Sequence, residues 1–312
     1  GNMPQINNIA SVLDSTFSIP KLTTGLVLGV MLWMIIAGGI KRIAKIASKL
    51  VPVMAVIYFG GALVVVAENY QNIIPSFHSI FSQVFSGSAA AGGFLGASFA
   101  MSLKLGVARG LYSNEAGQGS SPIAHASAKA EHSVEQGMVS ILEPFIDTIV
   151  VCSVTALVIL SSGAWTQKYD NTFERSSMAI FAGSYAEGNS KDVEELGKYI
   201  LDARNFTSDT TNVENFTGSL DLIDGQMQKQ NVTVFHNNSI AEDVVFYQGG
   251  EPVSGLLEIS NGKIADSSVR VEGKSLIHSA ELTSKAFGSG VLGIYGEYIV
   301  AIGLLLFAFS TA

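Results

Sequence analysis

Residues 22–40 read LTTGLVLGVMLWMIIAGGI, a run of 19 residues without a charged side chain. The next nine residues, KRIAKIASK at 41–49, contain four basic side chains. An α-helix rises 1.5 Å per residue, so the apolar run gives a helix of about 28 Å, which crosses most of the ~30 Å hydrocarbon layer of a bilayer. The stretch therefore predicts a membrane-spanning helix that ends in a basic connection.

Four further apolar segments predict additional spans. They are residues 50–67, 86–107, 137–160 and 290–312. Between the second and the third span, residues 69–85 contain Pro75 and His78 and predict a short re-entrant or interfacial segment. We therefore expect an all-α polytopic membrane domain with five spans in this chain.

Basic residues orient these spans. Lys and Arg accumulate in cytoplasmic connections, so we expect the basic connection at 41–49 to lie in the cytoplasm. Alternation then places the connection at 109–135 in the cytoplasm and the long segment after residue 165 outside the membrane. The expected location is the cell (plasma) membrane.

Charge divides the chain into two kinds of sequence. Hydrophobic residues make up 48% of the 312 residues and charged residues only 14%, whereas soluble proteins carry about 25% charged residues. Yet 18 of the 26 acidic and 10 of the 18 basic residues lie between positions 168 and 285, so this segment carries the whole net charge of −8. This composition excludes a disordered chain and a coiled coil.

The predicted organisation has three parts. Residues 1–165 form a membrane transport domain, 166–289 an acidic extracytoplasmic insertion, and 290–312 a truncated membrane helix. The insertion is expected to be α+β, because it combines a helical pattern with short apolar runs between Gly, Asn and Asp turns. The expected helix is 193–203 and the expected strands are 232–236, 244–247, 256–259 and 269–271.

The stretch GVARGLYSNEAGQGSSPIAHASAKA, residues 106–130, is dense in small residues. Small side chains let membrane helices approach closely, so one interpretation is tight packing at a cytoplasmic connection. The other is a gate, in which Arg109, Asn114 and Glu115 form a polar latch that opens and closes. The two interpretations are compatible.

Two further features could carry chemistry. The sequence AGGFLG at 91–96 has three glycines in five positions, which favours an unwound point whose N–H groups could bind a carboxylate, although a glycine-packed helix crossing is the alternative. Glu143 and Asp147 lie four residues apart on one helix face. Two ionised carboxylates this close repel each other, so proton sensitivity is a hypothesis here, and an interfacial position is the alternative.

The 106–130 stretch resembles the signature of the alanine or glycine:cation symporter family, the sodium:alanine symporters. The matching positions are Arg109, Gly110, Tyr112, Ser113, Asn114, Glu115, Ala116, Gly117, Gly119, Ser120 and Pro122. Similar family segments are GNMPQ at 1–5, GGIKRIA at 38–44, FIDT at 145–148 and LFAFST at 306–311. Ser121, Glu143 and Pro144 depart from the family pattern, and the acidic segment does not resemble the family's usual short loop, so it looks like an insertion.

This resemblance implies a leucine-transporter-type fold, built from two inverted repeats with binding sites at broken helices near the membrane midplane. It implies sodium-coupled symport of a small neutral amino acid, alanine or glycine, by alternating access, with H⁺ coupling as an open alternative. It also implies that this chain is a fragment without the N-terminal helices and the C-terminal end.

The resemblance also implies roles for individual residues. Substrate binding falls to Gln5, Gly92, Gly93, Phe94 and Gly96, and sodium binding to Ser310 and Thr311. A gate or structural role falls to Arg109, Asn114, Glu115 and Asp147. Alternatives from the residues alone stay open, because Gln5 could be an interfacial amide and the two hydroxyls could bond back to their own helix.

The expected partners are alanine or glycine, sodium and the lipid bilayer, with no nucleic acid. We expect no cofactor and no metal beyond sodium, and no enzyme activity, because no nucleophile elbow, P-loop or metalloprotease motif occurs. A rival hypothesis is a transporter-like membrane sensor or binding protein that works through the extracytoplasmic insertion.

Overall fold

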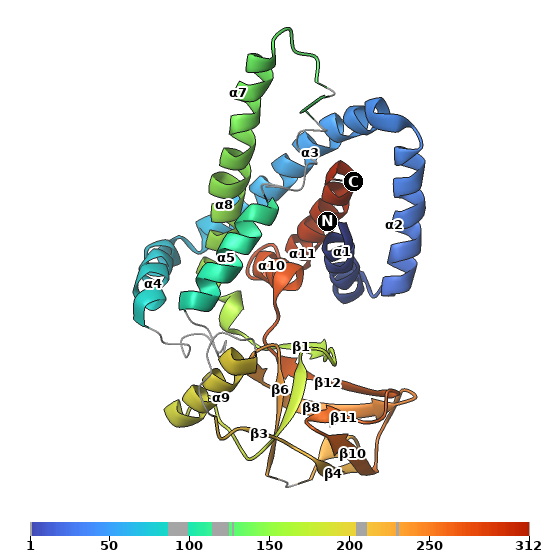
Figure 1. Cartoon of the computed structure of the whole chain (residues 1–312), viewed down its shortest axis with the longest axis vertical. Helices are drawn as coiled ribbons and strands as arrows, with labels where there is room; N and C mark the ends of the chain where they lie inside the picture. Colours follow the sequence, from blue (N-terminus) through green and yellow to red (C-terminus); the bar gives the residue numbers. More distant parts are fainter. Residues whose placement is uncertain are drawn as a thin grey trace. The chain divides into compact units, whose positions relative to one another are not determined.

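The computed structural model (Figure 1) describes residues 2–86, 99–113, 125–126, 128–203, 211–228 and 231–311. The chain divides into two compact units. The first contains Gly1–Ser79, Lys104–Ala164 and His278–Ala312, and the second contains Ile80–Leu103 and Trp165–Ile277.

The first unit is helical. Its elements are α1 (Asn2–Phe17), α2 (Lys21–Ile36), α3 (Gly39–Glu68), the 3₁₀ turn η1 (Tyr70–Asn72), α7 (Ser133–Pro144), the π-helix η2 (Phe145–Val151), α8 (Cys152–Ser162), α10 (Ser279–Gly288) and α11 (Ile294–Thr311). Two helices run across the boundaries of the division: α4 (Ile73–Ser86) and α5 (Phe99–Ser113).

Among the described residues, two helical segments are long and apolar enough to cross a membrane, Lys45–Glu68 and Ser133–Ser162. The apolar helices Lys21–Ile36 and Ile294–Leu306 are shorter. The sequence predicted five spans, so the described structure supports fewer. The third predicted span, 86–107, falls largely on residues outside the described part of the chain.

The prediction of a basic connection at 41–49 is wrong. Helix α3 already begins at Gly39, and the chain turns at residues 37–38, where the N–H of Ala37 bonds to the carbonyl of Trp33. Lys, Arg and Ala are good helix formers, so a basic segment that follows a Gly-Gly turn continues readily as the first turns of the next helix.

The fourth predicted span is continuous but changes its helical type. Pro144 has no N–H and cannot donate to the preceding turn, and a π-helix, Phe145–Val151, follows it directly. The segment from Ser133 to Ser162 therefore keeps one direction while its turns widen around Asp147.

Apolar side chains pack the helices of the first unit into two clusters. One joins α1, α2 and α11 through Ile9, Val12, Leu13, Leu28 and Ala301. The other joins α3, α8, α10 and α11 through Ala62, Val65, Val158, Ala164, Ala286, Phe287 and Val300. Helix α10 belongs to this unit, although the sequence pattern assigned residues 279–288 to the insertion, because Ala286 and Phe287 are fully buried in the second cluster.

The second unit is α+β. One helix, α9 (Ser190–Ala203), accompanies the strands β1 (Tyr169–Thr172), β2 (Met178–Ala182), β3 (Glu214–Asn215), β4 (Gly218–Ile223), β5 (Gln226–Met227), β6 (Val232–His236), β7 (Ser239–Ile240), β8 (Glu242–Gln248), β9 (Glu251–Pro252), β10 (Gly255–Ser260), β11 (Lys263–Ile264) and β12 (Val269–Ser275). The described strands form three antiparallel four-stranded sheets, in the orders β1-β12-β8-β9, β11-β10-β4-β5 and β3-β2-β6-β7.

The predicted helix and the four predicted strands of this segment are confirmed by α9, β6, β8, β10 and β12. The sequence predictions missed β2 and β4, which supply Ile180, Leu220 and Leu222 to the core that the sheets enclose. A second cluster packs α9 through Leu196 and Ile200 against Phe181.

Two-residue turns with positive φ at both positions close four hairpins of this unit. They are Asp224–Gly225, Asn237–Asn238, Gly249–Gly250 and Asn261–Gly262. Such turns match the twist of antiparallel strands and favour Asn, Asp and Gly. At Gly225 a Cβ atom would lie 2.6 Å from Val245 Cγ1, so only glycine fits this turn.

Candidate substrate and ion site

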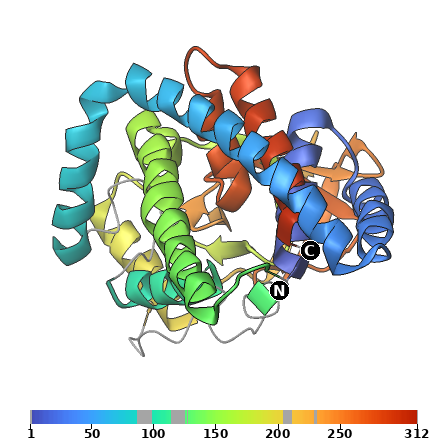
Figure 2. The ribbon, with the colours of Figure 1, turned by 90° about the horizontal axis from the view of Figure 1, so that it is seen from above.

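Helices α1 and α11 run antiparallel and in contact (Figures 1 and 2). The ring of Phe17 at the end of α1 stacks on Tyr298 near the start of α11, with centroids 4.9 Å apart. Further from this end of the pair, Ile9 and Val12 of α1 pack into one cluster with Ala301 of α11. Along this pair of helices, contacts at lower residue numbers of α1 are made with higher residue numbers of α11. The N-terminal turn of α1 therefore lies level with the C-terminal turn of α11.

This register brings together two of the predicted site elements. Gln5 lies in the N-terminal part of α1 and is half-buried, and Ser310 and Thr311 lie in the last turn of α11. The side chains of Ser310 and Thr311 are outside the described part of the structure. The backbone shows how far along α11 these two residues lie, but not what their side chains contact.

Other predicted site residues fall outside the described residues. These are Gly92, Gly93, Phe94, Gly96, Asn114 and Glu115. Arg109 is described on α5, where its side chain is exposed. The expected latch between Arg109 and its two polar partners is therefore not described.

Asp147 lies within the π-helix and is half-buried. The carbonyl of Asp147 accepts the N–H of Cys152, and the hydroxyl of Thr155 bonds to the carbonyl of Val151 at 2.8 Å. The same hydroxyl lies 2.6 Å from the phenol of Tyr58 on α3. Single π turns inside α-helices are frequent at functional sites, so this turn gives Asp147 an unusual backbone setting.

Sequence reasoning missed a polar joint between α3 and the turn that links α10 to α11. The carboxylate of Glu68 accepts the N–H of Val291 at 3.2 and 3.0 Å. Gly290 has φ +94°, and a Cβ there would overlap Glu68 Oε2. No local pattern could reveal this joint, because its partners are 223 residues apart in the sequence.

An ion pair braces the same turn. Lys285 Nζ of α10 lies 2.9 Å from Glu297 Oε1 of α11, and the two side chains are 33% and 18% exposed. Partial burial reduces the screening of such a pair by water. Helices α10 and α11 are thus held together by charge as well as by the contact of Gly296 with the carbonyl of Phe287.

A small hollow opens where the 106–130 stretch leads into α7. It encloses about 520 Å³ and is lined by His125, Ala128, Ala130, Ser133, Gln136, Gly137 and Ser140. His125 Nδ1 and Gln136 Nε2 are hydrogen-bonded across it. Small side chains along this wall are consistent with close helix packing.

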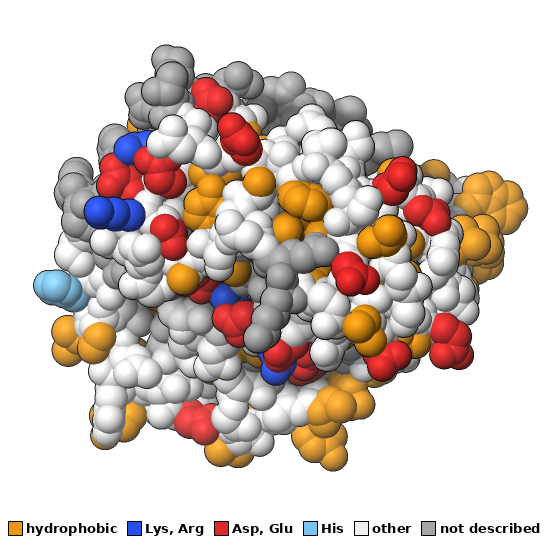
Figure 3. Space-filling model, turned by 90° about the horizontal axis from the view of Figure 1, so that it is seen from below, with side chains coloured by type: hydrophobic (Ala, Val, Ile, Leu, Met, Phe, Trp, Pro, Cys, Tyr) orange, Lys and Arg blue, Asp and Glu red, His pale blue; other side chains and the backbone are white. Residues whose placement is uncertain are grey.

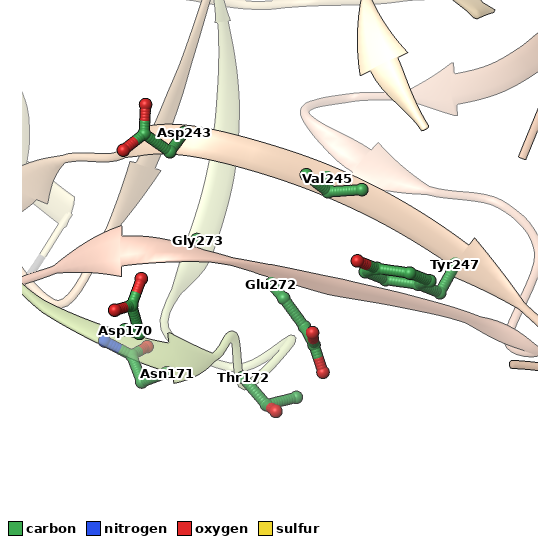
Figure 4. Close-up of a pocket in the computed structure, with 8 residues that line it drawn as sticks. All are labelled: Asp170, Asn171, Thr172, Asp243, Val245, Tyr247, Glu272 and Gly273. Carbon is green, nitrogen blue, oxygen red and sulfur yellow. The ribbon is translucent and has the colours of Figure 1, made fainter. Parts of the chain in front are cut away.

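The second unit has a hollow of about 460 Å³ on the sheet β1-β12-β8-β9 (Figure 4). Its lining residues are Asp170, Asn171, Thr172, Asp243, Val245, Tyr247, Glu272 and Gly273. Its carboxylates have basic neighbours. Lys274 Nζ lies 2.7 Å from Asp243, and this hydrogen bond raises the Lys274 pKa above its ordinary value.

Three carboxylates line this hollow, and the other acidic side chains of the second unit are more widely spread. In the face shown in Figure 3 they are scattered among other side chains. Within the described residues, no group of three His, Cys, Asp or Glu side chains could hold a metal ion.

The profile of the sodium:alanine symporter family matches residues 1–188. The chain belongs to this family. The predicted resemblance is thereby confirmed, and membership of this family implies a membrane location. The family is one of transporters.

Similar curated proteins agree with this assignment. The sodium/alanine symporter AgcS of Methanococcus maripaludis is 45% identical over 163 residues, 52% of this chain and 35% of its own length. A sodium/proton-dependent alanine carrier protein of Bacillus sp. PS3 is 39% identical over 170 residues, 54% of this chain and 37% of its own length.

A third relative carries a different substrate name. The probable sodium/glutamine symporter GlnT of Bacillus subtilis is 39% identical over 189 residues, 60% of this chain and 39% of its own length. The chain thus spans between 35% and 39% of the length of these three relatives.

Proposed function

We propose that the protein containing this chain is a secondary active transporter that couples the uptake of alanine or glycine to sodium. The family assignment carries the proposal, together with relatives named as sodium/alanine and sodium/proton-dependent alanine carriers. Sodium is the coupling ion in this proposal. A proton is the alternative, because the Bacillus sp. PS3 relative is named a sodium/proton-dependent carrier.

The α1–α11 pair is the proposed location of part of the site. Sodium is a hard cation that prefers oxygen ligands, and Ser310 and Thr311 offer two hydroxyl oxygens. Gln5 lies at the same end of the helix pair and offers an amide that can hydrogen-bond a zwitterionic amino acid. Binding of both ligands at one end of two packed helices would let each favour the same conformation.

The remaining substrate contacts in this proposal come from Gly92, Gly93, Phe94 and Gly96. An unwound helix there would direct free N–H groups at the substrate carboxylate. Arg109, Asn114, Glu115 and Asp147 have gate or structural roles in the proposal. The π turn around Asp147 supports such a role, since it is a local departure from α-helical geometry inside a candidate span.

Alternating access on a leucine-transporter-type fold is the proposed mechanism. Substrate and ion would bind one conformation together, so that the ion gradient drives the amino acid through a shared conformational equilibrium. The acidic segment, residues 166–289, is assigned to the extracytoplasmic side of the plasma membrane in this proposal, because four bases at 41–49 mark the opposite side.

The test is uptake of labelled amino acids by the full-length protein in proteoliposomes. We expect alanine or glycine to accumulate under an inward sodium gradient and not under a proton gradient alone. Glutamine belongs in the panel because of the third relative. Gln5→Ala should raise the KM for the amino acid about tenfold or more, whereas Asn7→Ala, an exposed polar residue of the same helix, should leave it within twofold.

One observation favours a second candidate function, a membrane sensor. The second unit has its own buried core, built around Ile180, Leu220 and Phe246, and an open hollow on one sheet. A sensor would bind a ligand without carrying it across the bilayer. Saturable ligand binding with no ion-dependent flux would favour this candidate over the transporter.

A further inference from the structure

Helix α4 carries an exposed apolar stripe directly after a candidate membrane span. Ile74 is 80% and Phe77 47% exposed, and Tyr70, which precedes them by one turn, is 63% exposed. These positions repeat at intervals of four and three residues, so they share one helix face, and Phe81 continues the spacing along the same helix. The opposite face packs inward through Ser76, which is 6% exposed.

Helix α4 begins next to the C-terminal ends of two candidate membrane spans. The span Lys45–Glu68 ends at Glu68, and the turn Tyr70–Asn72 leads directly into α4. Asn72 Nδ2 donates to the carbonyl of Ser161, at the end of the span Ser133–Ser162, with a distance of 2.8 Å. The start of α4 therefore lies level with the C-terminal ends of both spans.

The two spans run in the same direction. Tyr58 of α3 bonds to Thr155 of α8, and Asn72, in the turn that follows α3, bonds to Ser161 near the end of α8. Residue numbers increase from the first contact to the second in both segments, so the two spans run parallel to each other. Both spans therefore reach the same membrane surface, and the chain turns sharply away from α3 as α4 begins in both views (Figures 1 and 2).

The exposed stripe has the chemistry of a bilayer boundary. Helices that lie in this boundary bury one apolar face in the region between headgroups and acyl chains, and aromatic residues are enriched there. Helix α4, IIPSFHSIFSQVFS, contains no Asp, Glu, Lys or Arg, so attraction to anionic lipid does not contribute.

We propose that α4 is an interfacial helix and that its exposed Ile74 and Phe77, together with Tyr70 of the preceding turn, dock into the headgroup–acyl boundary of the leaflet at the C-terminal ends of α3 and α8. The occupant of this face is phospholipid, held by apolar contact and not by charge. The surface is continuous with the lipid-facing surface of the two spans. It requires membrane insertion of α3 and α8 but not the proposed transport activity.

The test measures the depth of α4 in the full-length protein. Single cysteines are introduced into a background in which Cys152 and every other cysteine of the full-length protein are replaced by serine, labelled with a small fluorophore and reconstituted into phosphatidylcholine vesicles. Nitroxides attached near the headgroup or deep on the acyl chain then quench each label according to its depth. Phe77→Cys and Ile74→Cys report the stripe, the second position guarding against a local effect of the label.

Two exposed positions provide matched controls. Val56, 74% exposed and 12 residues before the end of its span, lies about 18 Å along the helix from that end. Leu256, 75% exposed, lies on a sheet of the second unit. The deep nitroxide should quench Val56→Cys more than the shallow one does. Neither should quench Leu256→Cys, which should respond to aqueous iodide.

The proposal expects the shallow nitroxide to quench both stripe labels more than the deep one, with a ratio unchanged when anionic lipid is added. Quenching by iodide alone, as for Leu256→Cys, would overturn it by placing the stripe in water. Protection from all quenchers would overturn it by showing that protein covers the stripe. Deeper quenching, as for Val56→Cys, would overturn it in favour of a re-entrant segment.

Discussion

Replacing Gly290 with alanine should loosen the joint between α3 and the α10–α11 turn. Gly290 has φ +94°, outside the region that alanine adopts readily, and its new Cβ would overlap Glu68 Oε2. The carboxylate has a flexible stem and would swing away, which breaks its two contacts with the Val291 N–H. The substitution therefore combines backbone strain with the loss of a charge-assisted hydrogen bond.

The two contributions set the expected magnitude. Strain at positive φ costs about 1–2 kcal/mol, and loss of the hydrogen bond at this exposed N–H costs about 1 kcal/mol, because water replaces the partner. Gly290→Ala should thus lower the free energy of unfolding by about 2–3 kcal/mol. Gly293→Ala is the control, since Gly293 has φ +49° and a Cβ there would meet no atom within 4 Å; it should lose about 1 kcal/mol.

The assay is equilibrium unfolding of the full-length protein in mixed micelles, followed by intrinsic fluorescence. A double variant, Glu68→Ala/Gly290→Ala, removes the clash together with the bond, so its loss should fall about 1 kcal/mol short of the sum of the two single losses. Equal losses for Gly290→Ala and Gly293→Ala, with an additive double variant, would refute the role given to Glu68.

Three further predictions concern other contacts. Gly225→Ala should destabilise the second unit by about 2–4 kcal/mol through a clash at 2.6 Å, against about 1 kcal/mol for Gly249→Ala, which meets no atom within 4 Å; hydrogen exchange of the sheet amides separates the two. The pKa of Asp266 is lowered, first by the Ser268 N–H and then by its hydroxyl. This carboxylate interaction is present above the ordinary carboxyl pKa and is lost as the pH falls through the lowered one, so Ser268→Ala should shift the carboxyl titration upward, read from its ¹³C chemical shift. Tyr58→Phe should lower the free energy of unfolding by about 1 kcal/mol by removing the 2.6 Å bond to the α8 threonine, and an unchanged value in the same micelle assay would contradict this.

The sequence predicted the features that depend on composition and local pattern. The family follows from the segment at 106–130, and the helix and four strands of the acidic segment follow from their periodicity. The turns at Asp224–Gly225 and Asn261–Gly262 were equally predictable, since these dipeptides favour hairpins. The first of these turns closes the hairpin of β4 and β5, and the second closes that of β10 and β11.

The rest depends on contacts between distant residues. The assignment of α10 to the helical unit depends on the burial of Ala286 and Phe287 against α3 and α8. The joint of Glu68 with Val291 depends on an α3–α11 pairing that no local pattern encodes. A basic run between two apolar segments favours a connection, but Lys, Arg and Ala are good helix formers, so the residues at 41–49 form the first turns of α3 instead.

For the candidate site, the sequence could name residue types but not their neighbours. The level at which Gln5 meets the end of α11 follows only from the stacking of Phe17 on Tyr298 and the cluster around Ala301. The segment at 91–96 and the residues Asn114 and Glu115 stay predictions, because they lie outside the described part of the chain.

The sodium dependence of amino-acid uptake tests the central claim most directly. Alanine uptake by the full-length protein in proteoliposomes is measured against sodium concentration, for the unaltered protein and for Ser310→Ala/Thr311→Ala. The control is Ser15→Ala/Thr16→Ala, a Ser-Thr pair at the opposite end of the α1–α11 pair.

Removal of two oxygen ligands should weaken sodium binding by about 1.5–3 kcal/mol, which is roughly a 10- to 100-fold rise in the half-saturating sodium concentration. The control should stay within twofold. Alanine and glycine uptake that is independent of sodium, or an unchanged sodium dependence in Ser310→Ala/Thr311→Ala, would contradict the account.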